Sequence, residues 1–249
     1  MNAAALLDVQ ALHKRFGGVV ATDGVDLQVR AGEVHALIGP NGAGKTTLVA
    51  QLAGQLAPDS GRIVFDARDI TGASAHQRAR LGLGRSFQIT RLFASFGVLE
   101  HLAIALQAAS GPSIGAWRPV ARETALFDRA RAMLPRLGLQ AHAESPIHTL
   151  SHGQRRALEV GMAIAAGPRL VLLDEPMAGL GADESPRMEA LIGNLRHEAA
   201  LLLIEHDVDA VFRLADRVSV LVGGRIIASG KPDDVRRDPH VVAAYLGQE

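Results

Sequence analysis

The segment with the clearest chemical potential spans residues 39–47 and reads Gly-Pro-Asn-Gly-Ala-Gly-Lys-Thr-Thr. Its spacing fits G-x-x-x-x-G-K-S/T, the P-loop pattern. Glycines allow successive backbone N–H groups to turn inward and form a nest for phosphate oxygens, and a helix expected over residues 46–54 adds its positive N-terminal dipole. We therefore predict a nucleotide phosphate site composed of Gly39, Asn41, Gly42, Ala43, Gly44, Lys45, Thr46 and Thr47.

Two side chains of this segment have separate expected tasks. Lys45 can reach the β- and γ-phosphates, whereas the hydroxyl of Thr46 is placed to bind Mg²⁺. The chain has only three lysines, and arginine supplies the rest of its Lys+Arg total. A compact ammonium is thus retained where it would enter a crowded phosphate nest, whereas a planar guanidinium suits other geometries.

A pair of adjacent carboxylates gives the second strong signal. Residues 170–173 are four consecutive apolar residues, as expected of a strand buried on both faces, and Asp174 and Glu175 follow directly. Open α/β sheets bind their ligands at the carboxyl ends of the strands. Asp174 would hold Mg²⁺ through water, and Glu175 would polarise the attacking water. The alternative is a strand-end turn with solvated acids, which Pro176 favours.

Three further residues each have a functional and an ordinary interpretation. His206 follows a predicted buried strand, residues 201–204, where its imidazole could donate a hydrogen bond to a γ-phosphate, although a lone histidine is usually structural. Phe16, between two predicted strands, is either a platform for a nucleotide base or a core or hairpin aromatic. Ser151 is a natural N-cap for a helix over residues 154–166; with the flexible Gly153, that helix start is either a plain cap or a second anion site.

The elements that must position these residues follow from periodicity and turn signals. Strands are expected over residues 7–10, 19–29, 34–38 and 61–65, with Gly17-Gly18 and Asp23-Gly24 as turn signals. The two glycines at 223–224 predict a hairpin of strands 218–222 and 225–228. Helices are expected over residues 74–83, 92–109, 122–137 and 241–246, with a loop at 111–119. Residues 89 to about 157 form a helical insertion, whose apolar side chains would pack in the core or face a partner.

Composition narrows the function classes. The 249 residues are 48% apolar, enough for a sizeable core, and the formal net charge is zero with no basic stripe, so generic nucleic-acid binding is not expected. The absence of cysteine excludes disulfides, zinc ribbons and thiol catalysis. No apolar run approaches the ~18 residues that would predict a membrane span.

In this order, the elements resemble the ATP-binding subunit of an ABC transporter over nearly the whole chain. The most specific motif is residues 150–154, Leu-Ser-His-Gly-Gln, which looks like the ABC signature. The resemblance implies that Phe16 stacks on adenine, that Gln88 is the Q-loop glutamine contacting Mg²⁺ and the catalytic water, and that residues 177–181 form the D-loop. It implies a Walker B pair in Asp174 and Glu175, with Glu175 as base, and a switch histidine in His206.

The same resemblance implies a composite site and a division of the chain. The signature of a second ATPase subunit, through positions equivalent to Ser151 and Gly153, would close over the γ-phosphate. The fold expected is α/β: a P-loop NTPase with a RecA-like, mainly parallel core, an N-terminal antiparallel β subdomain and a helical signature subdomain. Residues 1–249 would form one ATPase domain, with residues 89–157 as the helical subdomain and residues 1–88 and 158–249 as the rest.

Two positions depart from the family pattern: His152 replaces the second signature glycine, and Gly181 replaces the usual Asp or Asn of the D-loop.

Finer details are similar to the branched-chain (hydrophobic) amino acid uptake family. They lie in residues 85–88, 91–93, 177–180, 204–207 and 244–247 and in the long loop at 110–119. This likeness implies an importer subunit that uses ATP and Mg²⁺ and works with a second ATPase subunit, either a copy or a related chain, on transmembrane permeases. A periplasmic binding protein would take part indirectly, and the chain would lie peripherally on the cytoplasmic face of the inner membrane. The alternative is a soluble or export ABC-type ATPase for iron–sulfur assembly or lipopolysaccharide export.

Overall fold

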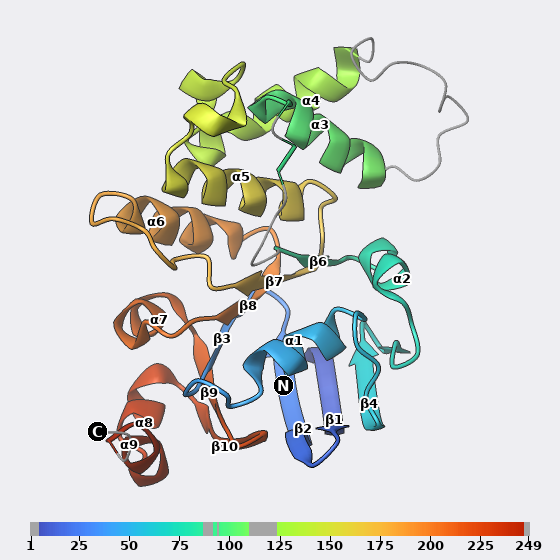
Figure 1. The fold of residues 1–249 in the computed structure, drawn as a ribbon, viewed down its shortest axis with the longest axis vertical. Coiled ribbons are helices and arrows are strands. Elements are labelled where there is room, and N and C mark those ends of the chain that lie inside the picture. Colours follow the sequence, from blue (N-terminus) through green and yellow to red (C-terminus); the bar gives the residue numbers. More distant parts are fainter. Residues whose placement is uncertain (1–4, 87–91, 94, 110–123, 247–249) are drawn as a thin grey trace.

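The computed structural model describes residues 5–86, 92–93, 95–109 and 124–246 of the 249-residue chain (Figure 1). In these residues the strands form two sheets, with orders β2-β1-β4-β5 and β10-β9-β3-β8-β7-β6. The first sheet comprises β1 (Ala5–Phe16), β2 (Val19–Arg30), β4 (Ser60–Phe65) and β5 (Arg68–Asp69). The second comprises β3 (Val34–Ile38), β6 (Leu83–Arg85), β7 (Leu170–Asp174), β8 (Ala200–Ile204), β9 (Arg217–Val222) and β10 (Arg225–Gly230).

The first sheet is antiparallel throughout its described pairings, as expected for the N-terminal part. Gly17-Gly18 turns β1 into β2, but the expectation of a turn at Asp23-Gly24 is wrong, because both residues lie inside β2. Leu12 pairs with Val25 and Lys14 with Thr22, so two residues of β2 face the single residue His13 of β1. That arrangement is a β-bulge, in which Gly24 takes a positive φ of 67° and donates its N–H to Nδ1 of His13 at 3.1 Å.

The second sheet is parallel from β9 through β6, and β10 joins its edge through the expected Gly223-Gly224 hairpin. All residues of β3, β7 and β8 are buried, which explains their unbroken apolar runs. Alternate side chains enter two apolar clusters, one shared with the antiparallel sheet and the other with the helices. The carboxyl ends of β3, β7 and β8 meet at one edge, where the candidate residues follow.

The helices cover the second sheet and extend beyond it. They are α1 (Lys45–Leu52), α2 (Ala75–Arg80), α3 (Val98–Ala109), α4 (Thr124–Leu137), α5 (His152–Ile164), α6 (Ser185–Leu195), α7 (Val208–Leu214), α8 (Pro232–Arg236) and α9 (Pro239–Leu246), with 3-10 turns at Gln140–His142 and Ile147–Thr149. Figure 1 shows α3, α4 and α5 at one end of the molecule and β1, β2 and β4 at the other. Within the described part of the chain, no helix has both the length and the hydropathy to cross a bilayer.

Two predicted helices differ from the structure in their bounds by more than two residues at one end. The helix expected over residues 74–83 ends at Arg80, because Leu83 pairs with Leu170 as the first residue of β6. The helix expected from residue 92 begins at Val98, where Glu100 accepts a hydrogen bond from the Gly97 N–H at 2.7 Å. The loop expected at residues 111–119 lies outside the described residues, and α5 runs without a break past residue 157.

Candidate active site

The phosphate loop connects β3 to α1 and is packed between the two sheets. A Cβ on Gly39 would overlap the carbonyl oxygen of Leu221 in β9, and a Cβ on Gly44 would overlap that of Ala21 in β2. Gly44 also has a φ of 105°, which side chains rarely adopt. The two glycines are therefore required by close backbone packing, which fixes the loop at the carboxyl end of β3.

The amino end of α1 presents donors to this loop. Gly44 caps the helix without a side-chain hydrogen bond, so no side chain of the cap competes for the N–H groups of the first turn. Lys45 is 8% exposed, and its Nζ donates to the carbonyl oxygens of Gly39 at 2.5 Å and Pro40 at 3.0 Å. Burial lowers the pKa of Lys45, while the nearby Glu175 and Asp174 oppose that change. The loop thus folds around its own ammonium, beside the exposed Thr46 hydroxyl.

The opposite end of α1 is held by a buried arginine that the sequence did not reveal. Arg78 is 1% exposed, and its guanidinium donates to the carbonyl oxygens of Gln51 and Leu52, both at 2.7 Å. It also donates to the carbonyl oxygens of Ala73 and Thr71, both at 3.0 Å. Burial lowers the pKa of Arg78. This cation caps the carboxyl end of the helix whose amino end faces the phosphate loop, an arrangement that the helix dipole favours.

Asp174 ends β7 as a buried carboxylate. It is 3% exposed, and Nη2 of Arg85 donates to its Oδ2 at 3.2 Å. Burial raises the pKa of Asp174, and the charge and hydrogen bond of Arg85 oppose that rise. Ser86 adds a backbone connection, because the Asp174 N–H donates to its Oγ at 3.3 Å. The carboxylate is thus held in one place next to the phosphate loop.

Glu175, directly after Asp174, has an unusual backbone conformation. Its φ of 48° is left-handed, which costs a non-glycine residue roughly 1–2 kcal/mol, and its N–H donates to the Ile204 carbonyl oxygen at 2.9 Å. The side chain is 28% exposed, and its Oε1 lies 4.0 Å from Nδ1 of His206. The ends of β7 and β8 therefore bring together the carboxylate and the imidazole that the sequence predicted separately.

Glu205 is a buried acid to which sequence reasoning gave no role of its own. It is 1% exposed, and its carboxylate accepts the N–H of Met177 at 2.8 Å and that of His206 at 3.3 Å. Burial raises its pKa, against the effect of these hydrogen bonds. Glu205 thereby ties the end of β8, just before His206, to the segment after Glu175. Its place directly after a buried strand, like that of Asp174, was the signal that could have identified it.

Ser151 is the N-cap of α5, as predicted, in a reciprocal capping box with Gln154. Its Oγ also donates to Oε1 of Glu184 at 2.7 Å, and the Gly153 N–H donates to the same oxygen at 3.0 Å. His152, at the departure from the signature, places Nε2 3.1 Å from the Ala178 carbonyl oxygen. Among the described residues, the hydrogen bonds of Ser151 and Gly153 thus join them to the start of α6 instead of residues 39–47.

Phe16 and Gln88 are the remaining candidate residues. Phe16 ends β1 and is 50% exposed, with Nζ of Lys14 5.7 Å from its ring centroid, so its ring is not part of the core. Its task as a base platform remains a prediction. Gln88 lies outside the described residues.

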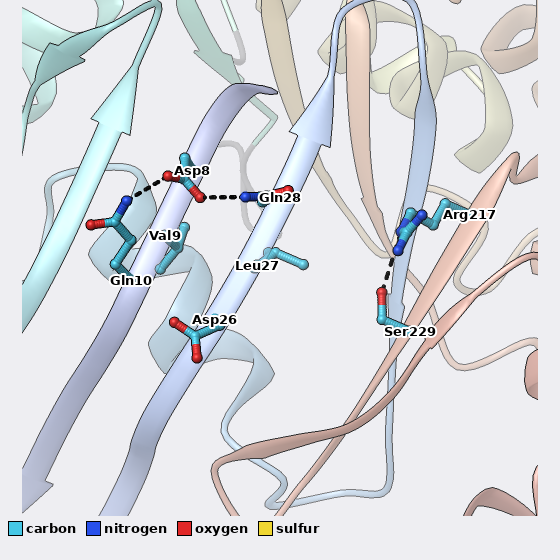
Figure 2. Close-up of a pocket in the computed structure, with 8 residues that line it drawn as sticks. All are labelled: Asp8, Val9, Gln10, Asp26, Leu27, Gln28, Arg217 and Ser229. Carbon is cyan, nitrogen blue, oxygen red and sulfur yellow. Dashed lines mark hydrogen bonds between the residues drawn. The ribbon is translucent and has the colours of Figure 1, made fainter. Parts of the chain in front are cut away.

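A separate hollow of about 350 Å³ lies between β1–β2 and β9–β10 (Figure 2). Most of its polar side chains bind one another: Asp8 accepts from Gln10 and Gln28, and Arg217 donates to Ser229. Beneath it, the Ser229 hydroxyl lies 2.8 Å from that of Ser219, which contacts the fully buried His35. None of the eight residues that line the hollow belongs to the phosphate loop or the strand ends with Asp174 and His206.

Comparison with known proteins gives consistent matches. A family described as ABC transporter matches residues 22–178, and one described as Branched-chain amino acid ATP-binding cassette transporter matches residues 225–249. The chain is 39% identical over 250 residues to the high-affinity branched-chain amino acid transport ATP-binding protein LivG of Salmonella typhimurium and 38% identical over 252 residues to BraF, of the same description, from Pseudomonas aeruginosa. Each alignment covers 98% of both chains. The crystal structure of the ADP conformation of MJ1267, an ATP-binding cassette of an ABC transporter, matches with a TM-score of 0.88 and 32% identity, covering 99% of this chain and 100% of that one.

Proposed function

Because the chain belongs to the ABC transporter family of ATP-binding proteins, we propose that it is the ATP-hydrolysing subunit of an importer for branched-chain or other hydrophobic amino acids. The observation that carries this proposal is the match over 98% of both chains to proteins named for branched-chain amino acid transport. The second family match, at residues 225–249, supports the same substrate class. Export is the less supported alternative: the lipopolysaccharide export system ATP-binding protein LptB of Acidithiobacillus ferridurans matches over 98% of both chains, but at 35% identity, below the 38–39% of the importer proteins.

In this proposal the phosphate loop binds the phosphates of ATP. The first-turn N–H groups of α1 and the ammonium of Lys45 oppose the negative charge that phosphoryl transfer spreads over the phosphate oxygens. Phe16, exposed at the end of β1, would stack on the adenine. Lys45 now donates hydrogen bonds to the carbonyl oxygens of Gly39 and Pro40. When ATP binds, phosphate oxygens would replace at least one of these acceptors.

Oxygen ligands suited to Mg²⁺ lie beside the loop. The fixed carboxylate of Asp174 and the exposed hydroxyl of Thr46 fit such an ion, which takes oxygen ligands and usually keeps several waters. We assign these two residues and Gln88 as its holders. The ion would neutralise phosphate charge when bound.

Glu175 is the proposed general base. Its partly exposed carboxylate lies 4.0 Å from Nδ1 of His206, whereas Asp174 is paired with Arg85. A base that accepts the proton of the attacking water needs this access, whereas Asp174 is buried. His206, 60% exposed at its side chain, would orient the γ-phosphate, and Glu205 fixes its backbone through the 3.3 Å hydrogen bond.

Two kinds of partner are proposed, a second ATPase subunit and a transmembrane permease. We propose that the positions equivalent to Ser151 and Gly153 of a second ATPase subunit, a copy or a related chain, complete the site. An aromatic pair, Phe93 and Phe96, has ring centroids 5.3 Å apart, and Phe93 is 54% exposed. His101 supports it by accepting the Phe93 N–H at Nε2 over 2.9 Å. This pair, in the segment that follows Gln88, would contact a transmembrane permease at the cytoplasmic face of the membrane.

The proposal extends to the division of the chain. Residues 89–157, which include α3, α4 and the start of α5, would act as the subdomain that transmits closure, and residues 1–88 and 158–249 would hold the nucleotide. A periplasmic binding protein would deliver the solute to the permease without contacting this chain.

Deletion of the gene in its own organism tests the function. Uptake of radiolabelled leucine, isoleucine and valine should fall, uptake of lysine should not, and a plasmid copy should restore it. A plasmid copy with Phe93→Asp should fail to restore uptake and should lose co-purification with membrane protein, while the purified variant still hydrolyses ATP. Unchanged uptake of every hydrophobic amino acid in the deletion strain would contradict the importer assignment.

A further inference from the structure

A carboxylate of this same chain occupies the hydrogen-bond donors of the signature segment. Glu184 is the N-cap of α6, and its side chain extends to the start of α5. Its Oε1 accepts both the Ser151 hydroxyl at 2.7 Å and the Gly153 N–H at 3.0 Å, and its Oε2 accepts the Gly181 N–H at 3.4 Å. One anionic group thus joins the signature to the segment that follows the acidic strand.

The two signature donors can each serve one strong acceptor at a time. A serine hydroxyl carries one proton, and so does a backbone N–H. With both protons given to Glu184, neither is directed at a phosphate oxygen. A phosphate arriving at these donors would also meet a carboxylate of its own charge at hydrogen-bond distance from them, which is unfavourable.

The packing around Gly153 fits the carboxylate closely. A Cβ at this position would lie 2.7 Å from Cδ and 2.8 Å from Oε1 of Glu184. The space beside Gly153 is therefore already filled by the Glu184 carboxylate. The residue that the sequence marked as flexible enough to admit a phosphate is instead in contact with an internal anion.

We propose that Glu184 is an intramolecular competitor that occupies the signature donors until the γ-phosphate held by a second subunit displaces it. This inference rests on the proposed function, because it assumes an ATP-dependent dimer. Glu184 would then weaken the ATP-driven association of the subunits without contacting the nucleotide bound at residues 39–47 of the same chain. A symmetric dimer contains two signatures. The two Glu184 side chains therefore each change the dimer dissociation constant by the same factor, and the two factors multiply.

The charge state of Glu184 supports this role. The hydrogen bond from Ser151, and then that from the Gly153 N–H, hold the pKa of Glu184 below its usual range. The side chain therefore stays ionised at neutral pH, where a charged acceptor binds these donors more strongly than a neutral one.

The test measures dimerisation and nucleotide binding separately in the full-length chain. All samples carry Glu175→Gln to suppress turnover, and sedimentation equilibrium with MgATP gives the dimer dissociation constant. Glu184→Ala removes the competitor, Glu184→Gln keeps its shape without the charge, and Asp183→Asn is the matched control, since Asp183 is an exposed acid one residue away. A fluorescent ATP analogue at low protein concentration reports binding by the monomer, and thermal unfolding reports folding.

We expect Glu184→Ala to tighten the dimer about tenfold, roughly threefold for each signature released, with Glu184→Gln between it and the unaltered protein. Asp183→Asn should stay within about twofold, and monomer affinity for the ATP analogue should be equal in all samples. Equal dimerisation of all four proteins, or a weaker dimer in Glu184→Ala, would overturn the role of Glu184 while leaving the proposed ATPase intact. Loss of ATP binding in every sample would contradict the proposed function and with it this inference. The absence of an ATP-dependent dimer in every sample would overturn this inference alone, because the proposed function also allows a related chain as the second subunit.

Discussion

Nη2 of Arg85 donates a hydrogen bond to Oδ2 of Asp174 across 3.2 Å and so connects the ends of the neighbouring strands β6 and β7. The side chains are 11% and 3% exposed, and the other arm of the guanidinium binds Oε1 of Gln55. Arg85 is therefore the counter-charge that the buried Asp174 needs, and it fixes the carboxylate that we assign to Mg²⁺.

Replacement of Arg85 tests this relationship. Arg85→Met should lower the free energy of unfolding by about 3 kcal/mol, because it leaves a buried carboxylate without its partner. Arg85→Lys should cost less, since an ammonium can pair with Asp174 but lacks the fork that also reaches Gln55. Arg131→Met is the control, because its pair with Glu144 is more than half exposed on both sides and is worth no more than about 1 kcal/mol. Denaturant unfolding that gives equal losses for Arg85→Met and Arg131→Met would contradict the assigned role.

Glu175→Gln should separate binding from hydrolysis. Glutamine has the same shape and keeps the left-handed backbone, so only the proton acceptor is lost. We expect the turnover number for ATP to fall about 10²- to 10⁴-fold while ATP affinity is retained. Steady-state phosphate release and equilibrium nucleotide binding measure the two quantities. Glu189→Gln, in α6 and paired with Arg213, should change neither quantity. Near-normal turnover in Glu175→Gln would remove Glu175 as the base.

Phe16→Ala should weaken the binding of ATP about 5- to 150-fold, because stacking of a base on an aromatic ring is worth about 1–3 kcal/mol. Binding of inorganic triphosphate should not change, since it has no base. Val19→Ala is the matched control, because Val19 pairs with Phe16 across the β1–β2 turn and is 66% exposed. If calorimetry shows the same loss for ATP and triphosphate, the ring acts on the phosphate loop and not on adenine.

Glu205 should make stability depend on pH in a defined direction. Burial raises its pKa in the folded chain, so the folded state binds this proton more tightly than the unfolded state. Its contribution is complete below the unfolded pKa and is lost as the pH rises through the folded pKa. The unfolding free energy of the wild type relative to Glu205→Gln should therefore decline as the pH rises above about 4.3, the ordinary pKa of a glutamate, while other groups cancel in the difference. A difference that does not vary with pH would contradict this assignment.

Local sequence signals predicted the fold well because each element carries its own pattern. The apolar runs before Asp174 and His206, the glycines of the phosphate loop and the N-cap at Ser151 all act over fewer than ten residues, and the structure places them as expected. The bulge at Asp23-Gly24 was misjudged because a bulge depends on the partner strand, here one residue of β1 facing two of β2.

The contacts that complete the site could not be predicted in this way. Glu184 meets Ser151 across 33 positions of the sequence, Glu205 meets Met177 across 28, and Arg85 meets Asp174 across 89. Each of these side chains is an ordinary charged residue in its local context. Only the folded arrangement of strands and helices gives it a partner.

The arginine behind α1 has a consequence for how the site behaves in solutions of different ionic strength. Arg78 places a full positive charge at one end of an eight-residue helix, about 12 Å from the end that faces the phosphate loop. Dissolved counterions cannot gather around a guanidinium that is 1% exposed, so they screen its field much less than that of a surface lysine. Part of the proposed attraction for phosphate would thus come from the interior of the protein and would weaken less in concentrated salt than the part that surface charges supply.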